Sequence, residues 1–426
     1  MVNSFLIKFK WIFFICLAGF FAFCLPLQIN AGFAPQIFVR NLKISEIKNG
    51  EIKGEFNIWN SESYYLNNLN YQVKLFNNGT PKEFELIDEV VSKETFFVPP
   101  NKTITKSFSY AFPQNIISGD YVLRVRIITD RGTELGWQDQ KVSLAGENNF
   151  LEMHPALSKV LLNGKVHTPL EGINISPSES VTALLEVKNP GDAITVVPHI
   201  KIFNRQINMP VFKEYQDSPI AFTKGETKKV QLQMPKIDIP ESYLAEVKFY
   251  KDNEQVSGIQ YFRWVVEGEG GKILYVKADK DYFRAGESIN LTVQSIGPAD
   301  GVDIGGGQLE VIVSDKNGNL IAKTSKEVSL TSDLVFSAIA IPIKKDLITP
   351  EINVKLTKNG KVLDERTINL PKFSEGAKAL EQEMLEKARI KMFLIYLSLS
   401  LAALILILVS GFLLYKFKIK KNQWKK

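Results

Sequence analysis

The amino-acid sequence predicts an all-β chain of three tandem β-sandwich domains, followed by a short helical stalk and one transmembrane α-helix. Short runs of alternating apolar and polar residues fill positions 35–371 and end at Gly, Pro, Asn or Asp, as in antiparallel sandwiches. One scheme of strands and turns recurs three times within this stretch. Two uncharged apolar segments flank it, one near each end of the 426-residue chain.

The N-terminal segment, residues 1–31, has the composition of a secretory signal peptide. Two lysines come before an uncharged apolar run, and Ala31 supplies a small residue ahead of a cleavage point at Gly32. Ile29 is larger than the residue usual at its position, so an uncleaved signal anchor is the alternative.

The repeat joins a strand that ends at a proline to a strand that opens after a corner. In the first copy the strand ends at Pro113 and the next one opens eight residues later at Tyr121. The second copy has Pro235 and Tyr243 at the same spacing. The third copy is looser, with Ile352 in place of the tyrosine.

Each copy closes with a turn and a last strand, which predicts sandwiches at residues 35–146, 150–267 and 272–371. Lengths of roughly 100 to 118 residues match the immunoglobulin-like sandwich. In that fold a tyrosine after the corner ties the connection between two strands, with its ring in the core and its hydroxyl bonded to nearby backbone. Tyr121 and Tyr243 are expected to act in this way.

The opening halves of the second and third domains repeat as well. Ser176–Val181 precedes the strand Ala183–Lys188, and Arg284–Ile289 precedes the strand Asn290–Gln294. Here the chain resembles bacterial immunoglobulin-like surface modules, particularly the cell-adhesion-related (CARDB-like) family. The resemblance covers two of the three domains. It implies a sandwich fold and a place on the cell surface, and it transfers no binding residue.

Two linkers are expected between the domains. Ala145–Asn149 is polar and rich in turn residues, and Glu267–Gly271 contains three glycines. The second linker is therefore expected to be flexible and to let the second and third domains bend.

The C-terminal segment predicts a stalk at 372–391, a transmembrane helix at 392–415 and a basic cytoplasmic tail at 416–426. The middle part has 24 residues without a charge. As a helix it would be about 36 Å long, enough for a hydrocarbon core of about 30 Å. The tail has six lysines and no acid, whereas the stalk mixes both signs. The positive-inside rule then places the C-terminus in the cytoplasm and the sandwiches outside.

Cysteine usage bears on the source and the compartment. The only two cysteines, Cys16 and Cys24, lie in the predicted signal peptide, so a cleaved mature chain contains none. The sandwiches would be held by core burial alone, without the inter-sheet disulfide that is common in extracellular domains of animals. This favours a bacterial surface protein and excludes thiol catalysis in the mature chain.

No residue pattern in the sandwiches predicts catalysis, a cofactor or a metal. His154, His167 and His199 match no zinc-binding spacing, and His199 is expected to be surface-exposed or half-buried on a strand. Asp315–Asn319 resembles the start of a calcium loop, but later ligand positions do not fit and an Asn-Gly hairpin turn explains it better. Gly305–Gly307 is expected to be a flexible loop, not a phosphate-binding loop.

Aromatic residues are the candidates for ligand contact. Trp59, Trp137 and Trp264 could stack on a glycan, but Trp137 and Trp264 recur on closing strands, which favours a packing role for both. Tyr64-Tyr65, near a loop of the first domain, is a slightly better contact hypothesis.

The expected function is that of a membrane-anchored extracytoplasmic interaction, adhesion or envelope-scaffold protein, not an enzyme. Nine lysines in the two end segments supply most of the formal charge of +6, so the nearly neutral middle gives no reason to expect a nucleic-acid partner. The expected partners are the lipid bilayer and an extracytoplasmic protein or glycan. The alternative is a polysaccharide-binding accessory protein or an enzyme that acts on envelope polymer.

Overall fold

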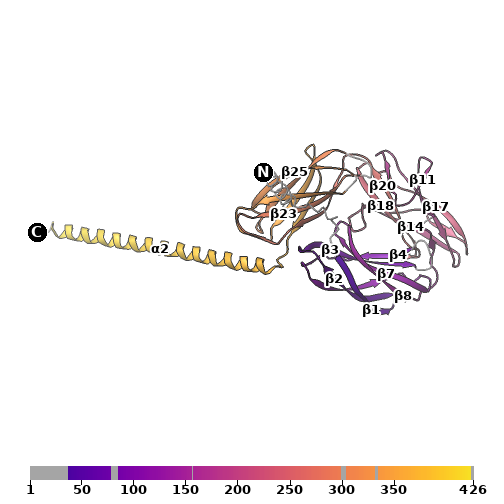
Figure 1. The fold of residues 1–426 in the computed structure, drawn as a ribbon, viewed down its shortest axis with the longest axis horizontal. Helices are drawn as coiled ribbons and strands as arrows, with labels where there is room; N and C mark the ends of the chain where they lie inside the picture. Colours follow the sequence, from indigo (N-terminus) through magenta and orange to yellow (C-terminus); the bar gives the residue numbers. More distant parts are fainter. Residues whose placement is uncertain (1–36, 78–84, 156, 299–303, 332–333, 424–426) are drawn as a thin grey trace, which may run out of the picture. The chain divides into compact units, whose positions relative to one another are not determined.

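The structure is a computed structural model that describes residues 37–77, 85–155, 157–298, 304–331 and 334–423 (Figure 1). The predicted signal peptide, both cysteines and the cleavage point lie outside these residues. The described part is all-β up to one C-terminal helix, and it forms three immunoglobulin-like sandwiches in tandem, each with its own hydrophobic core.

The first sandwich packs a sheet of order β1-β2-β6 against a sheet of order β4-β3-β7-β8, with β5 beside β3. All pairs are antiparallel. Alternate residues of each strand point into the core between the sheets, as period-two patterns require. The strands are β1 (Ile37–Lys48), β2 (Glu51–Asn60), β3 (Leu66–Asn77), β4 (Leu86–Val91), β5 (Phe96–Val98), β6 (Thr103–Ala111), β7 (Gly119–Thr129) and β8 (Glu134–Leu144).

The second sandwich packs the sheet β11-β10-β13-β17 against the sheet β12-β20-β18-β14-β15. Three short strands, β9, β16 and β19, pair beside these paths. The strands are β9 (Glu152–Met153), β10 (Lys159–Leu162), β11 (Lys165–His167), β12 (Ile173–Ile175), β13 (Thr182–Lys188), β14 (Ile194–Asn204), β15 (Val211–Gln216), β16 (Ile220–Phe222), β17 (Thr227–Gln233), β18 (Glu241–Lys251), β19 (Glu254–Gln255) and β20 (Gln260–Val266).

The third sandwich packs the sheet β21-β23-β26 against the sheet β25-β24-β28-β29, with the small pair β22-β27 at one end. The strands are β21 (Lys272–Ala278), β22 (Tyr282–Phe283), β23 (Ser288–Ile296), β24 (Gly306–Ser314), β25 (Leu320–Ser329), β26 (Val335–Pro342), β27 (Leu347–Ile348), β28 (Glu351–Lys358) and β29 (Lys361–Asn369). The same strand order therefore recurs as β4-β3-β7-β8, β15-β14-β18-β20 and β25-β24-β28-β29.

The two predicted tyrosine corners are confirmed. The Tyr121 hydroxyl donates a hydrogen bond to the carbonyl of Ile117, and the Tyr243 hydroxyl donates one to the carbonyl of Ile239 at 2.9 Å. Both rings are buried in the core of their sandwich, and burial raises the pKa of the Tyr121 hydroxyl to about 12. Ile352, the residue at this place in the third sandwich, is buried as well.

Glycines that were expected to be flexible serve close packing. In the second linker, a Cβ added to Gly270 would lie 2.7 Å from the carbonyl oxygen of Pro240, so only glycine fits there. Gly271 is buried beside it. Bending of the second and third domains about this linker stays a prediction. The prediction of a flexible loop at Gly305–Gly307 is wrong for Gly306 and Gly307, which open strand β24.

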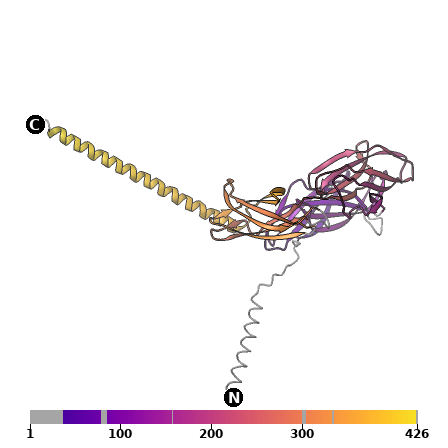
Figure 2. The same cartoon turned by 90° about the horizontal axis from the view of Figure 1, so that it is seen from above.

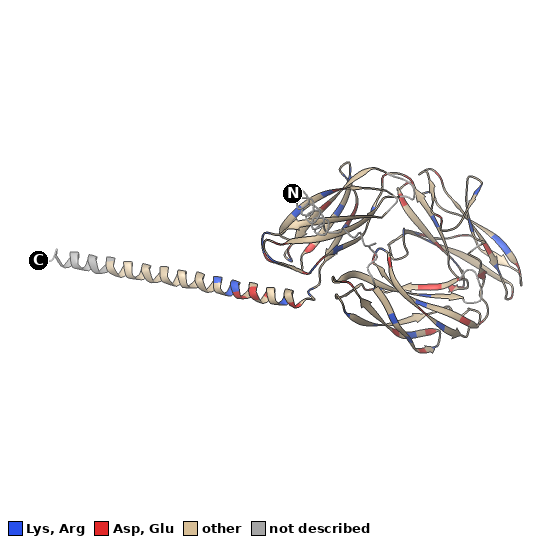
Figure 3. Ribbon diagram, in the orientation of Figure 1, with Lys and Arg blue, Asp and Glu red and all other residues tan. Residues whose placement is uncertain are grey.

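The C-terminal helix α2 (Glu375–Gln423) runs without a break from the third sandwich through the predicted transmembrane segment (Figure 2). Its charged residues up to Lys391 lie in the first turns, and residues 392–412 are uncharged (Figure 3). The helix is long and apolar enough to cross a membrane, and the side chains of its most apolar stretch are not buried against the rest of the described chain.

The start of α2 is fixed to the third sandwich, so the predicted stalk is not a free spacer. The Ser374 hydroxyl accepts a hydrogen bond from the Ala377 amide at 3.0 Å and so caps the helix. The buried carboxylate of Asp281 accepts hydrogen bonds from the Phe373 and Ser374 amides. Ala377 and Leu380 are fully buried.

Candidate functional site

The described sandwiches contact one another through buried charged side chains. The candidate site lies among these contacts. Between the first and second sandwiches, the Lys248 ammonium lies 3.1 Å from an oxygen of Asp88 and 3.3 Å from an oxygen of Glu246. Burial raises the pKa of both carboxyls, and the cation between them opposes that effect. Glu89 joins the same cluster through Tyr261 and through Lys74 at 2.7 Å.

Glu85, a further acid at this interface, is buried and forms no ion pair with the cations of the described residues. One Glu85 oxygen accepts a hydrogen bond from the Met153 amide of the second sandwich at 2.8 Å. Burial raises the pKa of Glu85 to about 7, while the hydrogen bond from Met153 opposes the shift. The folded chain thus holds a proton that the unfolded chain releases near pH 4.5.

We expect the free energy of unfolding to fall as the pH rises from about 4.5 to about 7. A raised carboxyl pKa stabilises the fold below the unfolded pKa, and that contribution is lost as the pH rises to about 7 and above. One such proton changes the free energy of unfolding by up to about 1.4 kcal/mol per pH unit. Glu85→Gln keeps a carbonyl oxygen for Met153 and should flatten this slope. Urea unfolding of both proteins between pH 5 and 8 measures it, and parallel slopes would contradict the assignment.

The first and third sandwiches exchange aromatic side chains. Tyr65 is 1% exposed and belongs to the core of the third sandwich, where its ring lies 4.9 Å from that of Phe373. Tyr275 of the third sandwich packs into the core of the first. The Lys277 ammonium lies over the Tyr64 ring. The prediction that Tyr64-Tyr65 contacts an external ligand is therefore wrong, because these side chains pack against the neighbouring sandwich.

A chain of ion pairs links all three sandwiches. Arg366 of the third sandwich pairs with Asp130 of the first. Next to it, Arg131 lies 3.5 Å from Asp364, whose other oxygen is 3.6 Å from Lys272. Lys272 is 3.3 Å from Glu241 of the second sandwich, and Glu241 accepts a hydrogen bond from Arg205 at 2.8 Å. Each of these cations has less than a fifth of its side chain exposed.

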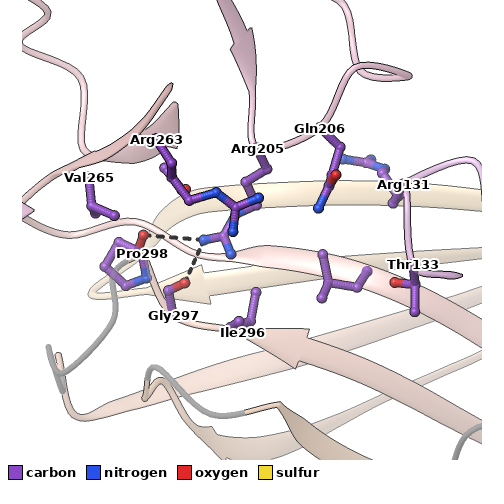
Figure 4. Close-up of a pocket in the computed structure, with 11 residues that line it drawn as sticks. Arg131, Thr133, Arg205, Gln206, Arg263, Val265, Ile296, Gly297 and Pro298 are labelled. Carbon is purple, nitrogen blue, oxygen red and sulfur yellow. Dashed lines mark hydrogen bonds between the residues drawn. The ribbon is translucent and has the colours of Figure 1, made fainter. Parts of the chain in front are cut away.

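A cavity of about 150 Å³ lies beside this chain (Figure 4). Three arginines line it, Arg131 from the first sandwich and Arg205 and Arg263 from the second. Arg205 has φ near 63° at the end of β14, and its guanidinium donates to the Gly297 carbonyl at 2.6 Å. The other lining residues are Thr133, Gln206, Ser242, Val265, Leu274, Ile296, Gly297 and Pro298.

Sequence reasoning missed this cavity. Arg131 of the first sandwich is 74 positions before Arg205, and Arg263 is 58 positions after Arg205, so nothing in their local sequence marks them as neighbours. The usable signal was the run Asp130-Arg131 at the tip of the β7–β8 turn, which places an acid and a base next to each other on a hairpin.

The histidine and turn predictions are settled by local geometry. His199 is half-buried and stacks on Tyr250 with ring centroids 4.2 Å apart, as expected for a packing residue. Asp315 accepts hydrogen bonds from the Asn317 and Asn319 amides, and Gly318 has φ near 78°, which confirms the hairpin turn. Among the residues that the structure describes, no group of three or more His, Cys, Asp or Glu could hold a metal ion.

The tryptophans differ from one another. Trp264 is buried, as predicted, but Trp137 is 49% exposed and lies under the Arg124 guanidinium, so the packing role predicted for Trp137 is wrong. Trp59 stacks on Phe38 across β1 and β2 with ring centroids 5.1 Å apart. The Arg40 guanidinium covers both rings. The sequence did not indicate Phe38, because cross-strand neighbours depend on register.

Comparisons with known proteins show only distant likenesses. No protein-family model matches the chain. A search of curated proteins gave no match. Red sea bream transglutaminase aligns at 12% identity over 54% of this chain and 31% of its own, with a TM-score of 0.21. The native conformation of E. coli alpha-2-macroglobulin aligns at 12% identity over 80% of this chain and 23% of its own, with a TM-score of 0.21.

A glycosyl hydrolase family 2 member from Bacteroides cellulosilyticus aligns at 14% identity over 44% of this chain and 26% of its own, with a TM-score of 0.20. The chain thus spans less than a third of the length of each of these proteins. Similarities of this size carry no argument about function, and the sandwich fold rests on the strand order described above.

Proposed function

We propose that this chain is a single-pass membrane protein whose sandwiches lie outside the cytoplasm and act as an interaction, adhesion or envelope-scaffold module without catalysis or a cofactor. The partners would be the lipid bilayer and an extracytoplasmic protein or glycan. The resemblance of the second and third domains to bacterial cell-adhesion-related modules supports this proposal.

The observation that carries the proposal is the continuity of α2 with the third sandwich. The helix is capped by Ser374, and its first turns are buried at Ala377 and Leu380. Side-chain ion pairs extend the contact, from Arg284 to Glu383 at 2.9 Å and from Lys387 to Asp346 at 3.6 Å. Only four residues separate Lys387 from the uncharged stretch that begins at Met392. The third sandwich would therefore sit close to the bilayer.

The buried acids support a structural role over a catalytic one. Catalytic carboxyls usually face a cleft where a substrate can reach them. Asp88 instead faces Lys248 and Glu89 faces the Tyr261 hydroxyl, both of the neighbouring sandwich. Glu246 faces Lys248 of its own strand, and Glu85 faces a backbone amide. The raised pKa values of Glu85, Asp88 and Glu246 follow from their burial between domains.

The alternative, binding to envelope polysaccharide, has one observation in its favour. Phe38 and Trp59 lie on the outer face of the β1-β2-β6 sheet, where Asn57 and Thr105 form a hydrogen-bonded pair at 3.0 Å. Aromatic rings with nearby hydroxyl and amide groups suit a sugar. Arg40 covers part of both rings, which makes this the second choice.

Protease protection tests the orientation. Protease added to intact cells, or to spheroplasts where an outer membrane shields the protein, should degrade the sandwiches and spare an epitope tag after Lys426, as the positive-inside rule requires. Loss of the tag while the sandwiches survive would reverse the topology. The detergent-solubilised protein should then retain a specific envelope protein. Retention on protein-free envelope polysaccharide alone would favour the alternative.

A further inference from the structure

We infer that the cavity bounded by Arg131, Arg205 and Arg263 is a binding site for an oxyanion, a phosphate or carboxylate group. Its volume of about 150 Å³ is comparable to cavities that hold a six-atom ring, so a phosphate or carboxylate fits. The inference goes beyond the proposed function, because the site would bind its anion whichever way the chain is oriented in a membrane.

The chemistry of the lining favours an anion. Guanidinium groups stay protonated at every physiological pH and present several donors in one plane, which matches the two oxygens of a carboxylate or phosphate edge. Thr133, Gln206 and Ser242 add hydroxyl and amide donors. None of the described lining residues has a carboxylate side chain.

The neighbouring ion pairs leave positive charge at the cavity. Among the described residues, Arg131, Lys272 and Arg205 form ion pairs with the carboxylates of two acids, Asp364 and Glu241. Arg366 and Asp130 form their own pair and do not change this balance. A cation that is largely removed from water is stabilised by an added anion. The half-buried state of Arg131 and Arg263 leaves a path from solvent.

The arginines differ in how firmly they are held. Arg205 donates hydrogen bonds to Glu241 at 2.8 Å and to the Gly297 carbonyl at 2.6 Å. Its guanidinium is therefore held in one position at the wall of the cavity. Arg131 lies 3.5 Å from Asp364 and donates a hydrogen bond to the Glu365 carbonyl at 3.5 Å, distances at which both contacts are weak and the guanidinium can turn toward a ligand. Arg131 is therefore the residue to change, and Arg205 is left intact because its two short contacts hold Glu241 and the Gly297 carbonyl in place.

Titration calorimetry of the full-length protein in detergent, with inorganic phosphate as the probe and chloride at matched ionic strength, tests the site. Phosphate should bind where chloride does not, and Arg131→Gln or Arg263→Gln should weaken it roughly tenfold or more, the usual effect of losing a charged hydrogen bond. Arg131→Lys keeps the charge and should lose less. Arg124→Gln, on the exposed face of β7, is the control and should bind phosphate as the wild type does.

The result that overturns the inference is equal phosphate affinity in the wild type, Arg131→Gln and Arg263→Gln, or a phosphate signal that chloride reproduces. Circular dichroism of each variant shows whether it is folded, and Arg263→Gln gives the answer should Arg131→Gln unfold. Soluble polyphosphate identifies the source of the anion. If the protein binds polyphosphate more tightly per phosphate group than inorganic phosphate, the natural ligand is a phosphate carried on a polymer. If the two affinities are equal, the ligand is the free ion.

Discussion

Replacing Tyr243 with alanine is expected to lower the free energy of unfolding of the second sandwich by about 3–5 kcal/mol, the usual cost of emptying a large aromatic site. The ring is fully buried, and it packs 5.9 Å from Trp264 and 5.2 Å from Phe212. Tyr243→Phe keeps the ring and removes only the hydrogen bond to Ile239, so it should cost about 0.5–1.5 kcal/mol. Urea unfolding followed by tryptophan fluorescence measures both, because Trp264 lies in the same core.

The matched control is Tyr250, which lies on the outer face of the same strand and stacks on His199. Tyr250→Phe should change the free energy of unfolding by no more than about 0.5 kcal/mol. Tyr121 holds the same corner of the first sandwich, and Tyr121→Ala should cost as much as Tyr243→Ala. A midpoint of Tyr243→Ala equal to that of the wild type would mean that the corner does not anchor the fold.

The corners could be predicted from the sequence because the contact that defines them is local. Each hydroxyl reaches a carbonyl four residues earlier, Ile117 for Tyr121 and Ile239 for Tyr243, so spacing along the chain contains the whole motif. The strand order around them follows from the same repeat, since consecutive antiparallel strands need only short connections. Local chemistry thus predicted the three sandwiches and the helix that follows them.

The two tryptophans show where such prediction stops. Both lie on the closing strand, but Trp264 pairs with Tyr243, the residue that faces the core, whereas Trp137 pairs with Arg126, five positions after Tyr121. An odd offset turns a strand residue to the opposite face, so Trp137 points outward. The pairing register therefore decides whether the tryptophan faces the core or the solvent. Finding that two strands occupy equivalent places in the repeat does not give their register.

Contacts between sandwiches cannot be predicted from local sequence patterns. Nothing near Tyr65 indicates that the third sandwich, more than 200 positions later, will bury its ring, and nothing near Arg131 indicates Asp364. These side chains looked like exposed loop residues because the surface that covers them comes from another domain. The candidate site is built from such contacts, which is why the sequence predicted the fold but not the cavity.

Replacing Lys248 with methionine is expected to lower the free energy of unfolding by about 3–5 kcal/mol, because removal of one partner leaves buried charges without compensation. Asp88 and Glu246 would lose the cation that now lies 3.1 Å and 3.3 Å from them. Their pKa values, already raised by burial, would rise further, so the loss should be largest at pH 8 and should shrink as the pH falls toward 5. Urea unfolding at the two pH values measures it.

The control is Lys201→Met in the same sheet, where the partner Glu214 lies at 3.4 Å and both side chains are well exposed. An exposed pair contributes about 0–1 kcal/mol, so this change should be small. The triple variant Lys248→Met, Asp88→Asn and Glu246→Gln removes the orphaned charges as well, and it should recover much of the lost stability because the cost comes from burying an unpaired carboxylate. A loss for Lys248→Met no larger than that for Lys201→Met would mean that the first two sandwiches do not hold these charges out of water.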